Sequence, residues 1–418
     1  MRAWHRQLSQ LASNTLNAKR TYLVAISTWF AAFGMQSVVF AWLVTLLLRE
    51  PAERVGLAQM SILLPGMLFI LLAGAIADRV GLRRQALWAQ LFAAVTPFLL
   101  IYFLSKGALT FGVVIVYALL MGLAQAFVTP ARDGLLNLVA GTDVQRMVML
   151  TSLCQFGFQI IGYSLAGFAD TVGQIYILGL QSFILLLGCG ALIAMGDVGK
   201  PLADPNKQST VLKDFWEGAT AVAGNPLLRA VMIQNVAMGI FFMGVFIVAF
   251  PIVLREVYDG TSADLASLNA VNSLGLVLTI VVLLRLGQIE RAGRALLLAQ
   301  FVGSIVLMLS GLVVQKGLFI FFVFLWGVCG GLAMPMSRTI MQQTAPPALR
   351  ARVMSFYAFS FMGAGPLGAL WAGYMADAYG PQLAIVISAG GMALLVAVMT
   401  FVSPLWRSVM KQDDVQST

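Results

Sequence analysis

The feature that most constrains the fold is a series of twelve long apolar runs. A helix needs roughly 20 residues to cross about 30 Å of hydrocarbon, and each run is long enough to do so. Of the 418 residues 60% are hydrophobic and 10% are charged, whereas a soluble domain carries about 25% charged residues. We therefore predict an all-α membrane protein with transmembrane helices near residues 22–48, 55–77, 86–104, 109–129, 147–169, 175–196, 227–251, 263–284, 295–314, 317–337, 353–376 and 381–404.

The basic residues indicate how these helices are oriented. The net charge is +9, and most Lys and Arg residues lie in the two tails and in the loops after every second run. Loops rich in Lys and Arg stay on the cytoplasmic side of a membrane. No basic face or recognition motif accompanies this charge, so we expect no nucleic-acid partner. We expect a multi-pass protein of a bacterial inner (plasma) membrane with both termini in the cytoplasm.

A long polar stretch at residues 197–226 divides the chain near its middle. It predicts three parts: an N-terminal six-helix bundle over 1–196, a cytoplasmic linker over 197–226 and a C-terminal six-helix bundle over 227–418. Within the linker, residues 211–217 mix apolar and charged side chains in a pattern typical of an interfacial helix. A plain linker without a helix is the alternative.

An internal repeat relates the two halves of the chain. Gly122 and Pro130 match Gly327 and Pro335 with the same spacing. After one extra residue the match continues with the pairs Arg132–Arg338, Arg146–Arg352, Gly162–Gly368 and Gly167–Gly373. Parallel halves of this kind build transporters in which a central cavity opens alternately to the two sides of the membrane.

The loop after the second run carries a charged motif. It reads G-A-I-A-D-R-V-G-L-R-R from Gly74 to Arg84. A glycine at the helix end allows close backbone approach, Gly81 permits a tight turn, and a carboxylate lies among guanidinium groups. Here the chain resembles the major facilitator superfamily, whose signature in this loop is G-x-x-x-D-R-x-G-x-R-R. The resemblance covers the whole chain, and the segments at 130–132 and 346–353 look like the branch of enterobactin exporters and related drug-efflux carriers.

The resemblance implies the major facilitator fold, with two pseudo-symmetric six-helix bundles, and a cytoplasmic gate. In this superfamily the signature carboxylate, here Asp78, meets the N-terminus of the eleventh helix, where the helix dipole and Arg352 supply positive charge. By the repeat, Glu290 would face Arg146, and Asp133 would hold Arg79 or Arg83. The expected gating residues are Gly74, Asp78, Arg79, Gly81, Arg83, Arg84, Asp133, Arg146, Glu290, Arg291 and Arg352.

The motifs of proton antiporters are incomplete in this chain. Ala118 stands where such antiporters carry an Arg, and their fifth-helix signature survives only as Gly162 and Gly167. By the run boundaries above, every carboxylate lies in a loop, a tail or a helix end, so none is the deep ionisable group that marks a functional site in a membrane. Coupling, where present, would use rim groups such as Asp78, Asp133 or Glu256.

Amide and aromatic side chains within the runs are candidates for lining a substrate cavity. Buried amides also join neighbouring helices by hydrogen bonds, which is the alternative role for each of them. Their spread over the helices that line the cavity in this superfamily favours the lining role for the set. The candidates are Gln36, Gln125, Gln155, Gln159, Gln234, Asn235, Asn269, Asn272, Trp326 and Tyr357.

The most favoured function is secondary active transport of a small amphipathic organic molecule, siderophore-like or drug-like, by alternating access and in the direction of export. An uncoupled facilitator, an importer and a non-transporting receptor with the same fold are the alternatives. The chain shows no Ser/His/Asp set, metal-ligand cluster or phosphate loop, so we expect no enzyme activity, no metal and no cofactor. The expected partners are the substrate, the lipid bilayer and, if transport is coupled, protons; we expect a monomer.

Overall fold

The computed structural model describes residues 2–140, 144–196, 211–286, 289–346 and 349–408. Within these residues twelve helices are long and apolar enough to cross a membrane, which confirms the predicted all-α membrane fold. The helices of the first half are α1 (Arg2–Trp42), α2 (Ala52–Val80), α3 (Leu82–Val95), α4 (Pro97–Ser105), α5 (Phe111–Ala140), α6 (Val144–Ala166), α7 (Ala169–Val172) and α8 (Gln174–Ala194).

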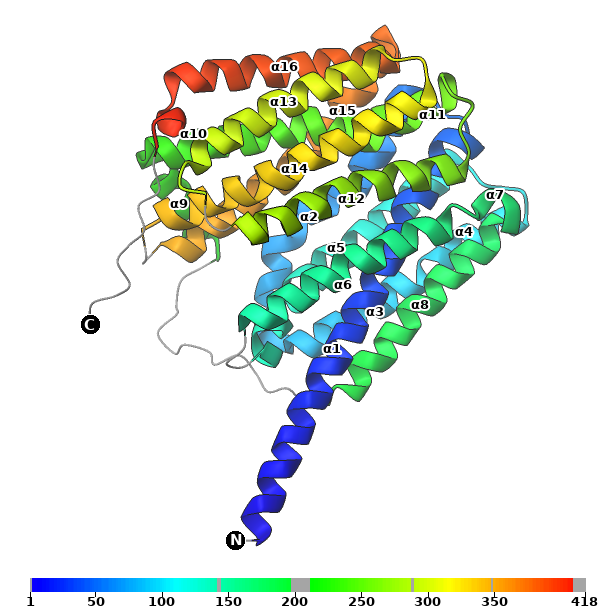
Figure 1. Ribbon diagram of the computed structural model, residues 1–418. Helices are drawn as coiled ribbons and strands as arrows, with labels where there is room; N and C mark the ends of the chain where they lie inside the picture. Colours follow the sequence, from blue (N-terminus) through cyan, green and yellow to red (C-terminus); the bar gives the residue numbers. More distant parts are fainter. Residues whose placement is uncertain (1, 141–143, 197–210, 287–288, 347–348, 409–418) are drawn as a thin grey trace. The chain divides into compact units, whose positions relative to one another are not determined.

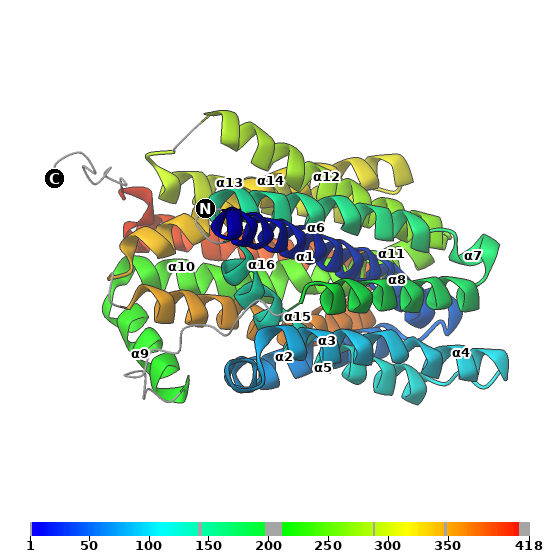
Figure 2. The same ribbon diagram turned by 90° about the horizontal axis from the view of Figure 1, so that it is seen from below.

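The second half begins with α9, which precedes the seventh span. Its helices are α9 (Val211–Gly224), α10 (Pro226–Ala237), α11 (Phe250–Glu256), α12 (Ser262–Leu286), α13 (Ala292–Leu312), α14 (Lys316–Thr344), α15 (Arg350–Tyr379) and α16 (Pro381–Val402). Short π-helical segments at Met238–Met243 and Val245–Ala249 join α10 to α11 in one continuous span. The first span also ends in a π-helical segment, Leu43–Leu47. Figures 1 and 2 show the long helices of each half running alongside one another.

Local sequence explains where several helices begin and end. Gly81 separates α2 from α3 with a φ of 100°, a backbone conformation that glycine adopts without a steric penalty. Pro97 starts α4 directly after α3 and so divides the third span. Asn225 caps α10, because its side-chain Oδ1 accepts a hydrogen bond of 2.9 Å from the Leu227 N–H.

The chain forms two compact units, each described by itself below. Unit 1 comprises Met1–Arg49, Ser61–Gln208 and Gly260–Ser267, and unit 2 comprises Glu50–Met60, Ser209–Asp259 and Leu268–Thr418. Each unit therefore takes most of its helices from one half of the sequence and the first turns of one helix from the other half. The start of α2 belongs to unit 2, and the start of α12 belongs to unit 1.

Helix packing within the units repeats from one half to the other. In unit 1, α3 packs on α5 and α8, and α1 packs on α6. In unit 2, α13 packs on α14 and α16, and the π-helical segment after α10 packs on α15. These are the pairings expected if the first, third, fourth, fifth and sixth spans correspond to the seventh, ninth, tenth, eleventh and twelfth.

The matched glycines lie at equivalent close contacts. Gly122 of α5 lies against the backbone of Ile62 on α2, and Gly327 of α14 lies against the backbone of Asn272 on α12. A side chain at either glycine would overlap a backbone carbonyl. The repeat in the sequence therefore reflects a repeated packing requirement, because only glycine lets these helix backbones approach so closely.

Two helices continue well beyond their predicted C-terminal ends. The fourth span was predicted to end at residue 129, but α5 continues to Ala140 with Pro130 inside it. Likewise α14 continues to Thr344 past the predicted end at 337, with Pro335 inside it. Membrane helices tolerate internal prolines because neighbouring groups satisfy the freed carbonyls. Arg132 and Asp133 consequently lie on a helix and not in a loop.

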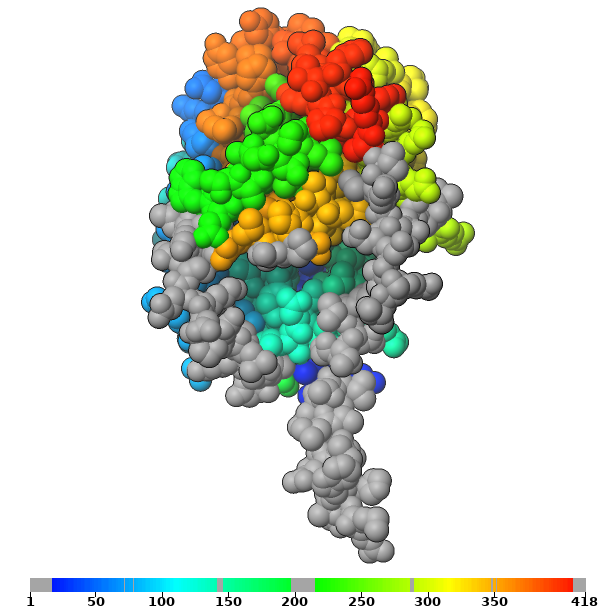
Figure 3. Space-filling model, turned by 90° about the vertical axis from the view of Figure 1, so that its left-hand side faces the viewer, coloured from blue at the N-terminus to red at the C-terminus, as the bar shows by residue number. Residues whose placement is uncertain are grey.

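Part of the predicted linker is helical. Residues 211–217, which the sequence predicts as an interfacial helix or, alternatively, as a plain linker, lie in α9. Phe215 of α9 packs edge-on against Phe356 and Phe359 of α15, with ring centroids 5.0 Å apart in both pairs. In Figure 3, α9 (green) lies on the surface of unit 2. Residues 197–210 of the predicted linker lie outside the described residues.

Candidate functional site

The signature loop between α2 and α3 joins helices within unit 1. The Arg83 guanidinium donates to the backbone carbonyls of Leu192 and Ile193 at 2.7 and 3.0 Å, and so caps the C-terminal end of α8. Arg79 and Arg84 are exposed. Gly81 makes the predicted tight turn. The side chain of Asp78 lies outside the part of the chain that the structure describes.

Gly74 was expected to allow close backbone approach. It lies within α2, and a Cβ added there would meet no described atom within 4 Å. Close packing within the described residues therefore does not explain this glycine. Its predicted place at the end of the helix is also corrected, because α2 continues to Val80.

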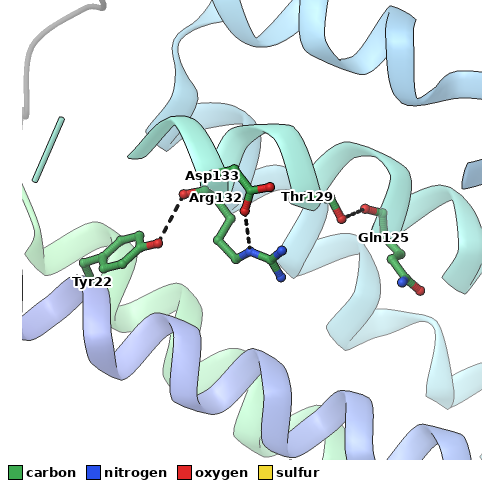
Figure 4. Close-up of polar contacts among 5 residues, drawn as sticks. All are labelled: Tyr22, Gln125, Thr129, Arg132 and Asp133. Atoms are coloured by element: carbon green, nitrogen blue, oxygen red, sulfur yellow. Dashed lines mark hydrogen bonds and ion pairs between the residues drawn. The ribbon is translucent and has the colours of Figure 1, made fainter. Parts of the chain in front are cut away.

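Asp133 was expected to hold Arg79 or Arg83, but its described ion pair is with Arg132. Arg132 Nε lies 3.1 Å from Asp133 Oδ1. The reason is the extension of α5, which places both residues on a helix beside α1 (Figure 4). The Tyr22 hydroxyl on α1 donates to the Arg132 carbonyl at 3.3 Å. The Arg132 guanidinium carbon lies 4.9 Å from the centroid of the Phe30 ring, also on α1.

The start of α15 is held by the helix that precedes the seventh span. Arg352 forms an ion pair with Glu217 of α9, and a side chain added at Gly218 would lie 2.6 Å from the Arg352 carbonyl oxygen. Arg352 was expected to add positive charge for the Asp78 carboxylate, and Glu217 is a partner that the sequence did not suggest. The other expected gating residues Arg146, Glu290 and Arg291 are exposed.

Two of the predicted cavity residues meet in unit 2. The Asn235 amide on α10 donates to the Tyr357 carbonyl at 3.1 Å and to the Ser360 hydroxyl at 2.8 Å, both on α15. The Tyr357 hydroxyl in turn lies 2.9 Å from the Ser337 hydroxyl on α14. A polar cluster of Asn235, Ser337, Tyr357 and Ser360 therefore joins three helices of unit 2.

Gln234 is the neighbour of this cluster on α10. Its side chain is 1% exposed, and neither Nε2 nor Oε1 has a hydrogen-bond partner among the described residues. A buried amide without partners carries a desolvation penalty of about 1–3 kcal/mol. Gln234 is therefore a polar group that a water molecule or a ligand would satisfy.

The remaining predicted cavity residues of unit 2 contact neighbouring helices. Asn272 on α12 lies at hydrogen-bond distance, 3.4 Å, from the Val323 carbonyl on α14. Trp326 of α14 packs against Phe242, Phe246 and Phe250 of the seventh span, with ring centroids 5.6–5.9 Å apart. Asn269 is buried. These contacts match the alternative role, in which such side chains hold helices together.

In unit 1 the predicted cavity residues lie on three helices. Gln36 on α1 is buried, whereas Gln125 on α5 and Gln155 on α6 are half-buried. Gln159 on α6 donates to the Tyr163 hydroxyl one turn later at 2.6 Å. Figure 4 shows the Gln125 and Arg132 side chains leaving the same side of α5, toward α1. The structure thus adds a charged group to a face that the sequence predicted to be neutral.

The start of α2 packs in unit 2 and the start of α12 packs in unit 1, and we call these two segments the exchanged helix starts. Each of them makes polar contacts. In unit 1, Asp170 Oδ2 accepts a hydrogen bond of 2.6 Å from the Ser262 N–H at the start of α12, and Oδ1 accepts one of 2.8 Å from Trp42 Nε1. In unit 2, Arg255 donates to the carbonyl of Glu50 at 2.6 Å, directly before α2. Each unit therefore holds the first turn of a helix that continues into the other unit.

Small residues accompany these polar contacts. A Cβ added at Gly373 of α15 would lie 2.9 Å from Gly56 Cα on α2, and one added at Gly167 would lie 2.9 Å from Ala266 Cβ on α12. Gly167 and Gly373 are partners in the sequence repeat. The repeat thus extends to the contacts that hold the exchanged segments.

Sequence reasoning missed Asp170, Glu217, Arg255 and Ser262. A local signal marked only the start of α12, where Thr261 and Asp264 have capping-box spacing and the Thr261 N–H donates to Asp264 Oδ2 at 2.8 Å. Asp170 and Glu217 lie in short polar segments with many equivalent neighbours, so the sequence did not distinguish them. Among the described residues, no three His, Cys, Asp or Glu side chains are placed to hold a metal ion.

Similarity to known proteins agrees with this architecture. Residues 15–417 match the family described as transmembrane secretion effector. The multidrug efflux pump Tap of Mycolicibacterium fortuitum is 26% identical over 396 residues, which cover 92% of this chain and 95% of that protein.

Solved transporters share the fold at lower identity. A single-residue mutant of the nucleoside transporter NupG matches with a TM-score of 0.73 and 15% identity over 92% of this chain and 99% of that one. A POT family transporter in complex with 5-aminolevulinic acid matches with a TM-score of 0.69 and 13% identity over 92% of this chain and 95% of that one. With its twelve spans and its family match over nearly the whole length, this chain belongs to the transmembrane secretion effector family of major facilitator superfamily transporters.

Proposed function

We propose that this protein exports small amphipathic organic molecules across a bacterial inner membrane by alternating access, as a secondary active transporter with both termini in the cytoplasm. The observation that carries the proposal is the exchange of helix starts between the units. α2 and α12 each begin in one unit and continue in the other, so both helices connect the two repeated bundles. Within unit 1 the start of α12 is held by the hydrogen bond from the Ser262 N–H to Asp170, and within unit 2 the start of α2 is held by the close approach of Gly56 and Gly373. A single hydrogen bond and a glycine contact are weak enough to open reversibly, as alternating access requires.

The direction of transport rests on similarity. The family is described as a secretion effector, and the Tap relative is an efflux pump. The polar candidates for contacting substrate are mostly amides and hydroxyls. They include the cluster around Asn235 and Tyr357 and the Gln234 amide, which has no hydrogen-bond partner among the described residues. Neutral donors and acceptors on an apolar background suit compounds that combine an apolar body with a few polar groups.

Proton coupling would depend on the carboxylates of the described residues. Asp133 lies on α5 within a membrane-spanning helix, but its side chain is 64% exposed and paired with Arg132. Asp170 and Glu217 lie outside the membrane spans or at their ends. We propose that coupling, if present, acts through carboxylates of this kind at gate contacts and not through a carboxylate at the substrate.

Transport into inside-out membrane vesicles tests the function. We expect vesicles that contain the protein to accumulate the neutral fluorescent probe dansylglycinamide faster than vesicles without it, because export in cells is uptake in inverted vesicles. Imposing and then collapsing a pH gradient separates coupled transport from facilitation. Efflux of preloaded probe instead of uptake would indicate an importer, and no movement of neutral, anionic or cationic dansyl probes would favour the receptor alternative.

Cysteine protection tests the proposed binding residues. In a background without Cys154, Cys189 and Cys329, single cysteines at Gln155 and Gln234 would be labelled with a maleimide in the presence and absence of a transported probe. We expect the probe to slow labelling at both positions, and an exposed cysteine at Glu53 serves as the control. Unchanged labelling at both positions with every transported probe would contradict the proposed lining.

A further inference from the structure

We propose that Arg132 is an anion-recognition residue, so that the preferred substrates of this transporter carry a carboxylate or a similar anionic group on their apolar body. This inference rests on the proposed transport function and specifies its substrate class. The run boundaries predict Arg132 in the loop after residue 129, but in the structure it lies on α5.

The Arg132 side chain points along α1 toward the middle of the first span. Its backbone carbonyl lies beside Tyr22, whereas its guanidinium lies over Phe30, eight residues farther along α1. Tyr22 and Phe30 lie about 12 Å apart along the axis of α1 at 1.5 Å per residue, and the Arg132 side chain covers part of this distance. The first span runs from Asn17 to Leu47, so Phe30 is near its centre. The positive charge is thus carried away from the end of the helix and into the bundle.

The guanidinium is only partly satisfied by the protein. Nε pairs with Asp133, and the Phe30 ring covers one face of the group. Neither terminal nitrogen, Nη1 or Nη2, donates a hydrogen bond to any residue in the described part of the chain. Four of the five N–H donors of an arginine are on these two nitrogens, and their planar fork matches a carboxylate or phosphate.

The environment favours binding of an anion over solvation by water alone. The Arg132 side chain is 18% exposed, so it is reachable from solvent but largely desolvated. Asp133, its only charged neighbour among the described contacts, is 64% exposed, and a solvated carboxylate neutralises a buried charge weakly. A second anion placed at the free fork would gain charge-assisted hydrogen bonds in surroundings of lower dielectric constant.

The neighbouring residues on α5 suit the rest of such a ligand. Gln125 and Thr129 precede Arg132 by seven and three residues and so lie near its face of the helix (Figure 4). The Thr129 hydroxyl is turned back to the Gln125 carbonyl at 2.8 Å, whereas the Gln125 side-chain amide makes no hydrogen bond with a described residue. The face therefore offers a cationic fork and, about two helical turns away, a neutral donor and acceptor.

A purely structural role for Arg132 makes a different prediction. If Arg132 only neutralises Asp133, then Asp133→Asn and Arg132→Gln should have the same effect on the preference for anionic over neutral ligands. If Arg132 recognises an anion, Asp133→Asn removes a competing carboxylate and should preserve or increase the preference for anionic ligands. The two substitutions therefore separate the two roles.

The test compares two probes that differ only in charge, the anion dansylglycine and the neutral dansylglycinamide. Their dissociation constants would be measured by fluorescence on the purified full-length protein in lipid nanodiscs. We expect the wild type to bind dansylglycine at least about tenfold more tightly than the amide, the range of a charge-assisted contact. In Arg132→Gln the ratio should fall to about one while binding of the amide stays within about twofold, which also shows that the variant is folded. Arg285→Gln, an exposed arginine on α12, is the matched control and should keep the wild-type ratio.

Several results would overturn the inference. These are a wild type without preference for dansylglycine, an Arg132→Gln variant that keeps the preference, or an Asp133→Asn variant that loses it. If Arg132→Gln binds neither probe, Arg132→Lys decides, because it keeps the charge but lacks the fork: a ratio reduced several-fold supports the inference and an unchanged ratio contradicts it. If vesicles transport dansylglycinamide but the protein binds dansylglycine no more tightly than the amide, the role of Arg132 is rejected and the proposed transport function stands. A clear preference without transport of either probe would reject the proposed function alone.

Discussion

The carboxylate of Asp170 accepts a hydrogen bond of 2.6 Å from the backbone N–H of Ser262. The Ser262 hydroxyl donates to the Gly167 carbonyl at 2.9 Å and lies 3.2 Å from the Asp170 N–H, from which it accepts. The first turn of α12 is thereby tied to the segment that ends α6. Free N–H groups and the helix dipole make a helix N-terminus a favourable place for a carboxylate, so this contact stabilises the start of α12.

Replacing Asp170 should loosen the first turn of α12. Asp170→Asn keeps an acceptor oxygen but loses the charge, so we expect a cost of about 1 kcal/mol, or roughly fivefold in the local opening equilibrium. Amide hydrogen exchange of residues 262–266 should rise accordingly, and Asp170→Ala should raise it further. Asp377→Asn changes an exposed carboxylate near the end of α15 and serves as the control. Equal exchange in wild type and Asp170→Ala would show that the contact does not hold α12.

Glu217→Gln should release α9 from α15. The Arg352–Glu217 pair is about one-third exposed, and exposed pairs contribute about 0.2–1 kcal/mol. We expect up to roughly fivefold faster hydrogen exchange in residues 215–224, with the Phe215 contacts retaining part of the docking. Glu53→Gln, which removes an exposed carboxylate at the start of α2, should leave α9 unchanged. Equal hydrogen-exchange rates of residues 215–224 in Glu217→Gln and Glu53→Gln would show that the docking of α9 does not depend on the ion pair.

Enlarging Gly373 should destabilise the contact between α15 and the start of α2. A Cβ there would lie 2.9 Å from both Gly56 Cα and the Ala52 carbonyl oxygen, neither of which is a flexible side-chain end. We expect Gly373→Ala to cost about 1–3 kcal/mol by overpacking and to lower the melting temperature in detergent. Gly190→Ala is the control, because a Cβ at Gly190 would meet no described atom within 4 Å. A melting temperature unaffected by Gly373→Ala would mean that the helices separate at little cost.

Asp78→Asn tests the expected cytoplasmic gate. If the Asp78 carboxylate holds a helix N-terminus closed, neutralising it should slow vesicle transport about tenfold and shift the populations of the transport states. The populations would be measured by maleimide labelling of single cysteines at Gln155 and Gln159. Asp78→Glu, which keeps the charge, should retain more of the transport. Undiminished transport together with unchanged labelling in Asp78→Asn would refute the gate.

The helices and the family could be predicted because their causes are local. A span must be about 20 apolar residues long wherever it packs, so the twelve runs followed from lipid solvation alone. The matched glycines 122 and 327 recur because the same backbone approach is needed in both halves. The helix ends were less predictable: the predicted fourth span ends directly before Pro130, which lies inside α5, and the predicted tenth span ends at residue 337, although α14 continues to Thr344.

The polar contacts could not be predicted, because they depend on how each helix is rotated against its neighbours. Asn235 and Tyr357 were both candidates, yet the sequence did not show that the Asn235 amide meets the Tyr357 carbonyl. Glu217 looked like any charged residue of a linker until α9 packed on α15. The pairing of Asp133 with Arg132 instead of Arg79 or Arg83 follows from the length of α5 and from its position beside α1.

The sequence by itself determined that this protein spans a membrane twelve times, that its halves are related and that it resembles the major facilitator superfamily. Those properties depend on the length of each apolar run, on the spacing of repeated residues and on short motifs, all of which are local features of the sequence. Only the tertiary structure decided that Arg132 points toward Phe30, that Asp170 holds α12 and that the units exchange the starts of two helices. These relationships join residues that are far apart in the sequence, such as Asp170 and Ser262 at 92 positions. They form only when packing places one helix face against another.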